Sequence, residues 1–235
     1  MGRRPVSGAS PQTGRIVAPP SEPLSLIEAA GPCTTKSVRT MQLTFNIADV
    51  SHLQQRSIHF AMNCVFGGGG PKDREAYFLV MNFARLVDFA IREYEYGRKA
   101  TLEFAEDTDS LSLGLIFRAS GHFEVCIDNV KRAIEHLKAL RMHPKVPQPI
   151  KALLPRGIKV LSRSVEVPIT GMRNAIQHLE NRIKKGEIAD GQSLALLPSE
   201  NELELGVHRI PYADLAEWLT ELHALSDRLA HYRDN

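Results

Sequence analysis

The chain has 235 residues, of which 43% are hydrophobic and 24% charged, and its formal net charge is +2. This composition suits a globular protein with one sizeable core, and no apolar run reaches the roughly 18 residues that a membrane-spanning helix needs. Because the net charge is nearly neutral, nucleic-acid binding by the whole surface is excluded and would require a local basic patch. We expect a cytoplasmic protein with no membrane contact, in which the scattered cysteines stay reduced.

The first 38 residues contain six prolines among serine, glycine and threonine. Prolines remove backbone hydrogen-bond donors, and the segment offers too little apolar surface to fold. We therefore predict a disordered leader over residues 1–38, followed by a single helical domain over residues 41–235.

The first elements of this domain follow from local patterns. Residues 41–47 alternate apolar and polar side chains, which predicts a short strand. Asp49 or Ser51 can cap a helix that runs to about Val65. Four glycines at 67–70 then interrupt the chain, and Pro71 suits the first position of the next helix. The glycines lack the Gly-Lys-Ser/Thr ending of a phosphate-binding loop, so we predict no nucleotide site there.

Residues 71–98 are apolar on more than one face, which predicts a helix at the centre of a bundle or in a dimer interface. Residues 101–118 contain a turn-like stretch and alternating leucines, and are predicted to form an irregular insert that allows a strand. Ser120 can cap a further helix that runs to about Arg141. In this helix His122 and Glu124 form a weak candidate for supporting a site.

Residues 144–163 contain four prolines and no acidic side chain, and they form the most basic stretch of the chain. A helix that opens near Ile169 follows and ends at two lysines and Gly186. Residues 194–197 and 202–207 flank a turn and predict a hairpin. Pro211 begins the last helix, whose one predicted apolar face contains Leu215, Trp218, Leu219, Leu222, Leu225 and Leu229. The fold class we predict is mainly α, a bundle of four or five helices with a small β-hairpin before the C-terminal helix.

Residues with catalytic potential cluster in the helix near Ile169. The apolar side chains of this helix, at three-and-four spacing, are Met172, Ile176, Leu179 and Ile183. This stripe leaves Arg173, Asn174 and His178 on other faces. Arg173 lies about 140° around the helix from His178, so its long side chain must reach to meet the imidazole.

The run Arg173-Asn174, three further residues and His178 resembles the signature of the HEPN superfamily, an arginine followed after four to six residues by histidine. The later Arg182-Ile183 pair is similar to the tail of this motif in bacterial HEPN-like proteins. The chain departs from that pattern at Gln177, where glutamate is usual, and at residues 179–181, where an aromatic residue and an acidic pair are usual.

The resemblance implies a HEPN-like helical bundle and a metal-independent endoribonuclease that works as a homodimer without a cofactor, for example a toxin or a defence effector with an antitoxin-like partner. His178 would transfer protons, because histidine titrates near neutral pH. Arg173 would stabilise the charged phosphorane, and Asn174 would orient the imidazole or a phosphate. RNA contacts would come from the basic segment and the end of the motif helix, at Lys151, Arg156, Lys159, Arg163 and Arg182.

Two alternatives from other classes remain open. The missing acidic residues around His178 favour a non-catalytic HEPN-like interaction or regulatory module whose helices bind a protein partner. A small-molecule sensor with an apolar pocket between helices is also compatible with the pattern. A ribonuclease should place Arg173 and His178 together in a positive cleft, whereas an interaction module should scatter them.

Overall fold

The computed structural model describes residues 43–66, 69–107, 112–154, 157–188, 193 and 195–233, which all fall within the unit Thr40–Asn235. The predicted leader therefore lies outside the described residues. Within the described ranges the chain forms six α-helices, a 3₁₀ turn and a three-stranded antiparallel sheet before the last helix. This confirms the predicted mainly helical class. In the same ranges, no helix combines the length and the apolar character that crossing a membrane requires.

The longest helix is α2 (Arg74–Glu106), and Asp73 defines its start. The Asp73 Oδ1 atom accepts hydrogen bonds from the N–H groups of Glu75 and Ala76, both at 3.0 Å. Buried apolar side chains cover several faces of α2, because α1 (Ser57–Phe66), α3 and α6 all pack against it. The predicted central position of this helix is confirmed.

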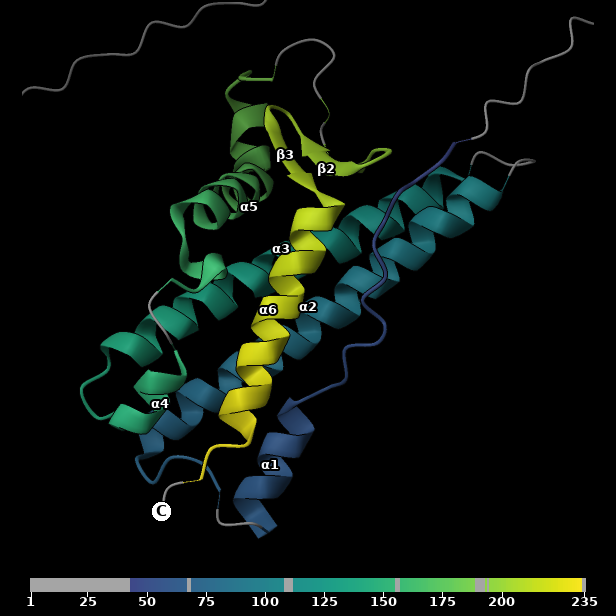
Figure 1. The fold of residues 1–235 in the computed structure, drawn as a ribbon. Coiled ribbons are helices and arrows are strands. Elements are labelled where there is room, and N and C mark those ends of the chain that lie inside the picture. Colours follow the sequence, from purple (N-terminus) through teal and green to yellow (C-terminus); the bar gives the residue numbers. More distant parts are fainter. Residues whose placement is uncertain are drawn as a thin grey trace, which may run out of the picture. The chain divides into compact units, whose positions relative to one another are not determined.

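Helix α3 (Leu113–Met142) runs antiparallel to α2 along most of its length (Figure 1). The two helices approach closely at Gly97, where an added Cβ would lie 3.0 Å from three atoms of the Phe123 ring. The predicted irregular insert at 101–118 is wrong, because both helices extend into it. Thr101 donates its hydroxyl to the Gly97 carbonyl at 2.9 Å, and Phe104 is buried, so the helical period continues beyond the predicted end.

Ser120 does not cap a helix, in contrast to the prediction. It lies buried inside α3, and its hydroxyl is within hydrogen-bonding distance of the carbonyls of Ile116, at 2.9 Å, and Leu196. A serine whose hydroxyl bonds back to the preceding helical turn and a serine that caps a helix give the same sequence pattern, so the pattern alone does not distinguish the two roles.

The segment before α1 contains no strand in its described part, residues 43–56, so the predicted strand is wrong there. Its backbone instead bonds to side chains of α2: Tyr94 donates its hydroxyl to the Ala48 carbonyl at 3.0 Å. Helix α1 begins later than predicted, at Ser57, because Asp88 of α2 caps it from a distance. The buried Asp88 carboxylate accepts hydrogen bonds from the N–H groups of Arg56, at 2.9 Å, and Ser57, at 2.8 Å.

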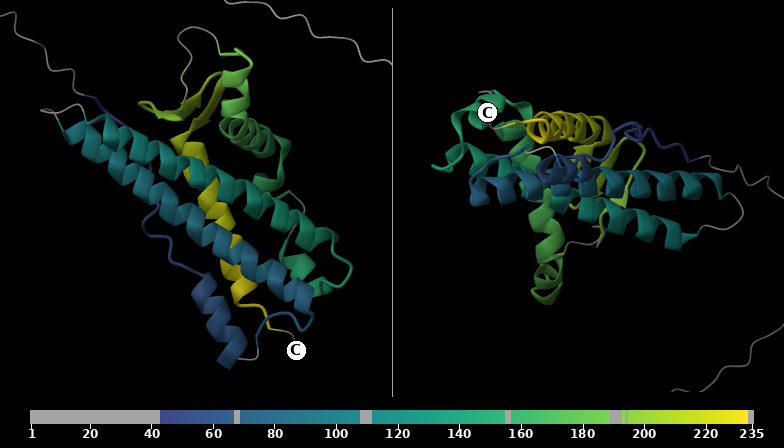
Figure 2. Two further views of the ribbon diagram at one scale, coloured as in Figure 1. Left: turned by 180° about the vertical axis from the view of Figure 1, so that it is seen from behind. Right: turned by 90° about the horizontal axis from the view of Figure 1, so that it is seen from below.

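Helix α6 (Tyr212–Ala230) lies across the α2–α3 pair, as the front and back views both show (Figures 1 and 2). Pro211 was predicted to begin this helix, but it is the last residue of β3 and lies one residue before the helix. The predicted apolar stripe is confirmed, and its buried side chains are Leu215, Trp218, Leu219, Leu222, Leu225 and Leu229.

Three short elements lead from α3 to the sheet: α4 (Gln148–Leu153), the 3₁₀ turn η1 (Lys159–Leu161) and α5 (Arg163–Lys184). Figure 2 (right) shows α5 and α6 on opposite sides of the α2–α3 pair. In the view from behind, α2 and α3 lie in front of α6, and α5 flanks α3 at that face (Figure 2, left). Among the described residues, no helix lies across this face of the pair.

The sheet contains β1 (Leu197–Pro198), β2 (Glu202–Leu205) and β3 (His208–Pro211), in the order β1-β2-β3. The predicted hairpin of two strands is thus part of a three-stranded sheet. Residues 206–207, which were predicted to belong to a strand, form the turn between β2 and β3. Gly206 has φ +61°, a left-handed conformation that favours glycine and reverses the chain into β3. The sheet packs on α5 at Gly171, where an added Cβ would lie 2.9 Å from His208 Nδ1.

Candidate functional site

The first half of α5 holds this helix on the bundle. Its buried side chains are Val165, Ile169, Met172 and Ala175. Of the predicted apolar stripe, Met172 is buried and Ile176 and Leu179 are half-buried, but Ile183 is 51% exposed, so the second half of the predicted buried stripe is wrong. The motif residues thus lie where α5 leaves the core. The helix ends as predicted, with Gly186 just beyond Lys184 at φ +67°.

Arg173 lies in a groove of about 440 Å³ between α2, α3 and α5. Its Nε donates a hydrogen bond to Asp128 Oδ1 at 2.8 Å, and the same carboxylate lies 3.9 Å from Arg132 Nη1. Gln177 of the motif lines this groove as well. One aspartate therefore orients two guanidinium groups, from α3 and from α5, toward a shared space.

Asn174 and His178 are exposed and do not line the groove that holds Arg173. Within the described part of the chain, neither side chain makes a hydrogen bond or an ion pair with another residue. A single protomer therefore holds the arginine of the motif in place and leaves its histidine without a group to orient it.

The predicted RNA-binding side chains that the structure describes differ in their surroundings. The fifth predicted side chain, Arg156, lies outside the described residues. Lys159 contacts α6, where the Glu217 carboxylate accepts a hydrogen bond from the Lys159 ammonium. This hydrogen bond raises the pKa of Lys159. Arg163 is exposed at the start of α5, Lys151 is half-buried in α4, and Arg182 donates to the Glu187 carbonyl at 3.5 Å.

A different row of side chains follows the open face of the α2–α3 pair. Successive members are three or four residues apart on each helix, so each set shares one helical face. We call this row the α2–α3 seam. Two pockets along it are lined by Arg85, Phe89, Tyr96 and Lys99 of α2, and by Arg118, His122, Val125, Asn129 and Arg132 of α3. Arg92 of α2 completes the row through its contact with the Phe89 ring. The sequence alone does not reveal the seam, because its two halves face each other only after α2 and α3 pair.

The seam contains a buried ion-pair network at its centre. Glu93 Oε2 lies 2.8 Å from His122 Nδ1, and Glu93 Oε1 accepts hydrogen bonds from Arg92 at 2.9 and 3.1 Å. Burial opposes ionisation of Glu93, but the hydrogen bonds from His122 and Arg92 outweigh it and hold the pKa of Glu93 below its usual range. His122 was predicted to work with Glu124; its partner is Glu93, from the other helix.

Glu124 lies in the groove beside Arg173 and is affected in the opposite direction. Burial raises the pKa of Glu124, although a backbone hydrogen bond from Leu196 partly offsets the effect. The groove therefore contains one carboxylate, Asp128, that two arginines engage, and another that its environment makes easier to protonate.

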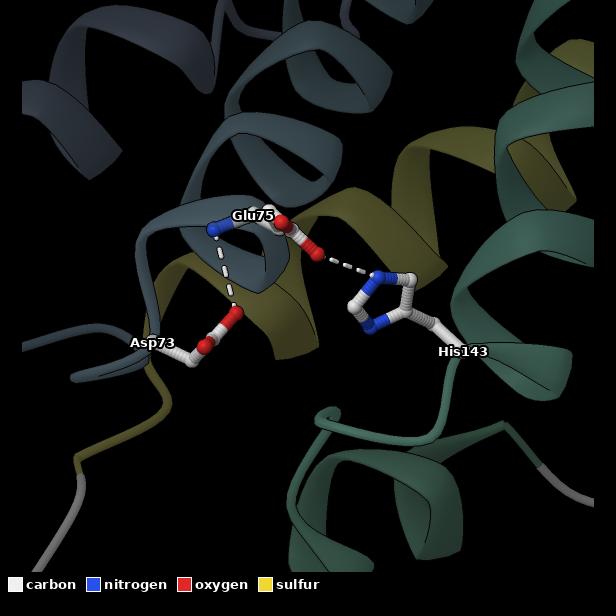
Figure 3. A group of neighbouring side chains, drawn as sticks. All are labelled: Asp73, Glu75 and His143. Carbon is white, nitrogen blue, oxygen red and sulfur yellow. Dashed lines mark hydrogen bonds and ion pairs between the residues drawn. The ribbon is translucent and has the colours of Figure 1, made fainter.

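Among the described residues, one group of three side chains could offer ligand atoms to a metal ion: Asp73, Glu75 and His143, whose ligand atoms lie within 4.8 Å of one another (Figure 3). Their contacts already have a structural explanation. Asp73 caps α2, and Glu75 Oε2 lies 2.9 Å from His143 Nε2. The start of the α2 dipole and Lys145, 3.5 Å from Glu75, both disfavour a cation here. We therefore assign no metal to this group, which ties the start of α2 to the end of α3.

Comparisons with protein-family models, with curated proteins and with solved structures found no match to this chain.

Proposed function

We propose that this protein is a HEPN-like RNA-binding protein that holds a single strand along the α2–α3 seam. The observation that carries the proposal is that cationic side chains from three helices lie along one face of the α2–α3 pair, a face that no other described helix crosses. These side chains are Arg85, Arg92 and Lys99 of α2, Arg118 and Arg132 of α3, and Arg173 of α5. A cationic row of this kind attracts the phosphates of a strand and provides the local patch that a nearly neutral protein needs.

The length of the seam and its aromatic side chains suit an extended single strand of RNA. Arg85 and Lys99, the two ends of the seam on α2, are 14 residues apart and therefore about 21 Å apart at 1.5 Å per residue, a length that several nucleotides can follow. Tyr96 is 49% exposed, and Phe89 lies between Arg85 and Arg92, whose guanidinium carbons are 5.3 and 4.7 Å from its ring centroid. Aromatic rings between cations are what proteins use to stack the bases of single strands.

Carboxylates within the seam orient its cations without blocking them. Glu103 contacts Arg118, and Asp128 contacts Arg132 and Arg173. Most of these side chains are at least a quarter exposed, and exposed ion pairs contribute only about 0–1 kcal/mol, so an incoming phosphate can replace the carboxylate. Their role is to hold the guanidinium groups in an extended, ready conformation.

The test is fluorescence anisotropy of labelled RNA. We expect a single-stranded RNA of about 12 nucleotides to bind with an affinity that falls steeply with salt, by about 0.7 logarithmic units for each phosphate contact. Duplex RNA of the same length should bind more weakly, because its bases cannot stack on Phe89 or Tyr96. Absence of salt-dependent binding, or equal binding of the duplex, would contradict the proposal; a matching single-stranded DNA measures the selectivity for RNA.

The groove carboxylate supplies a further prediction. Replacement of Glu124 by glutamine should strengthen RNA binding about threefold near pH 7.5, because it removes a negative charge beside the phosphates. At a lower pH, the raised pKa of native Glu124 lets it take up a proton, and the difference between the two proteins should shrink. Anisotropy titrations at both pH values measure the ratio; a ratio independent of pH would show that Glu124 does not face the RNA.

A second candidate is the endoribonuclease that the HEPN resemblance implies, acting as a toxin or defence effector. The exposed, unengaged imidazole of His178 favours it, because such a side chain is free to face the motif of a second protomer in a homodimer. This candidate predicts a loss of about 100-fold to 10,000-fold in RNA cleavage for His178→Ala with affinity kept, and a loss of both cleavage and affinity for Arg173→Ala. Cleavage in the presence of EDTA measures it, and equal cleavage by His178→Ala would reject it.

A further inference from the structure

The centre of the seam contains an arrangement that RNA binding alone does not require. Glu93 is 12% exposed in its side chain, and Arg92 already supplies two hydrogen bonds to its Oε1 atom. The other oxygen, Oε2, accepts from His122 Nδ1 at 2.8 Å. Of the histidines that the structure describes, His122 is the only one held by a buried carboxylate while also lining a pocket.

The hydrogen bond determines which nitrogen of His122 is available for chemistry. Because the ionised Glu93 accepts the Nδ1 proton, the neutral imidazole carries its lone pair on Nε2. The ring borders a pocket of about 310 Å³, which it shares with Tyr96, Lys99, Glu103 and Arg118. The Tyr96 ring lies 5.3 Å from the imidazole and fixes one side of the space. An oriented base therefore borders a pocket with two cationic side chains.

We infer that His122, oriented by Glu93, is the proton-transfer group of a phosphodiester-cleaving site for single-stranded RNA on the seam. This inference rests on the proposed RNA binding. In the reaction, His122 Nε2 takes the proton of a ribose 2′-hydroxyl, and the 2′-oxygen forms a bond to the adjacent phosphorus. The bond from phosphorus to the 5′-oxygen breaks, and the imidazolium returns the proton to that oxygen. The products are a 2′,3′-cyclic phosphate and a 5′-hydroxyl, and the reaction consumes no other reactant.

The neighbouring side chains have distinct tasks in this reaction. Arg118 and Lys99 stabilise the charge that develops on the phosphorane oxygens. Glu93 is a positioning residue, which keeps the reactive tautomer and stabilises the imidazolium. The motif histidine, His178, has no such partner among the described residues, so the two sites make opposite predictions.

The experiment incubates labelled single-stranded RNA with the full-length protein in EDTA and analyses the ends of the products. We expect 2′,3′-cyclic phosphate ends, and a loss of about 100-fold to 10,000-fold in rate for His122→Gln, with a much smaller loss of RNA affinity. His52→Gln, an exposed histidine before α1, is the matched control and should cleave at the native rate. Arg118→Ala provides a second variant on the other side of the pocket, with an expected loss of at least about tenfold.

The Glu93→Gln variant tests the positioning role. It keeps an acceptor for Nδ1 but removes the charge, so the rate should fall and the acid limb of the pH–rate profile should move to lower pH. None of the other side chains around the imidazole is substituted in this variant. They are Arg92, Tyr96, Lys99, Glu103 and Arg118. An unshifted profile would contradict the role of Glu93.

The outcomes separate the two proposals. Binding without cleavage, or cleavage that survives His122→Gln, overturns the inference and leaves RNA binding intact. Cleavage lost in His178→Gln but kept in His122→Gln overturns it in favour of the α5 motif. Absence of binding rejects both. Native melting temperatures show that the variants keep the fold. A loss of cleavage in His122→Gln that far exceeds its loss of RNA affinity supports the inference.

Discussion

The double variant Arg85→Glu/Arg132→Glu should bind single-stranded RNA about 100-fold more weakly than the native protein near 0.1 M salt. Each reversal removes a phosphate contact and adds a repulsive charge, and a loss of about tenfold per position corresponds to about 1.4 kcal/mol. Arg85 is exposed, and Arg132 lies 3.9 Å from Asp128, so neither substitution breaks a buried contact. The slope of affinity against salt should also become shallower, because fewer phosphates are neutralised.

The control for this prediction is Lys72→Glu/Lys185→Glu, which makes the same change in net charge at exposed positions outside the seam. It should weaken binding only slightly. A separate variant, Arg163→Glu, tests the basic segment that the sequence predicts as the RNA contact. Equal losses for the seam and control variants would mean that RNA binds through the general surface charge, which contradicts a defined site.

Replacement of Phe123 by alanine should destabilise the protein by about 3–5 kcal/mol, the usual cost of deleting a buried aromatic side chain. The Phe123 ring is fully buried where α2, α3 and α6 meet, with the rings of Tyr94 and Tyr212 both 5.8 Å away and Gly97 beneath it. The cavity would open between helices that cannot close it without shifting the long α2–α3 contact. The melting temperature should fall by about 10 °C or more for a protein of this size.

The matched control is Phe117→Ala, in the same helix but 61% exposed. It should change the melting temperature by no more than about 2 °C, since a surface substitution away from special features usually changes stability by less than about 0.5 kcal/mol. Thermal unfolding followed by circular dichroism compares the two variants. Similar losses would show that the core is not centred where α6 crosses the α2–α3 pair.

The proposed site lies along the α2–α3 seam, whereas the sequence predicts a site on the α5 motif, and this difference has a physical cause. The α5 motif was found because Arg173 and His178 lie on one helix, but neighbouring positions in a helix need not share a face. The structure places Arg173 in a groove with Asp128, 45 residues away, and leaves His178 exposed. A side chain joins a site through its direction and its distant partners, and a short sequence motif specifies neither.

The sequence by itself determined the features that depend on local chemistry. The leucine stripe of α6 predicts a helix with one buried face, and the lysines and glycine at 184–186 predict the end of α5, because periodicity and backbone freedom act within a few residues. The mainly helical class of the protein follows from the same periodicity of apolar residues. Only the tertiary structure decided the features that depend on partners far along the chain. Asp88 delays the start of α1 from 31 residues away, and Glu93 selects the tautomer of His122 from 29 residues away. Such contacts form only when α2 has packed against its neighbours, since a carboxylate can cap a helix or orient an imidazole only at hydrogen-bonding distance.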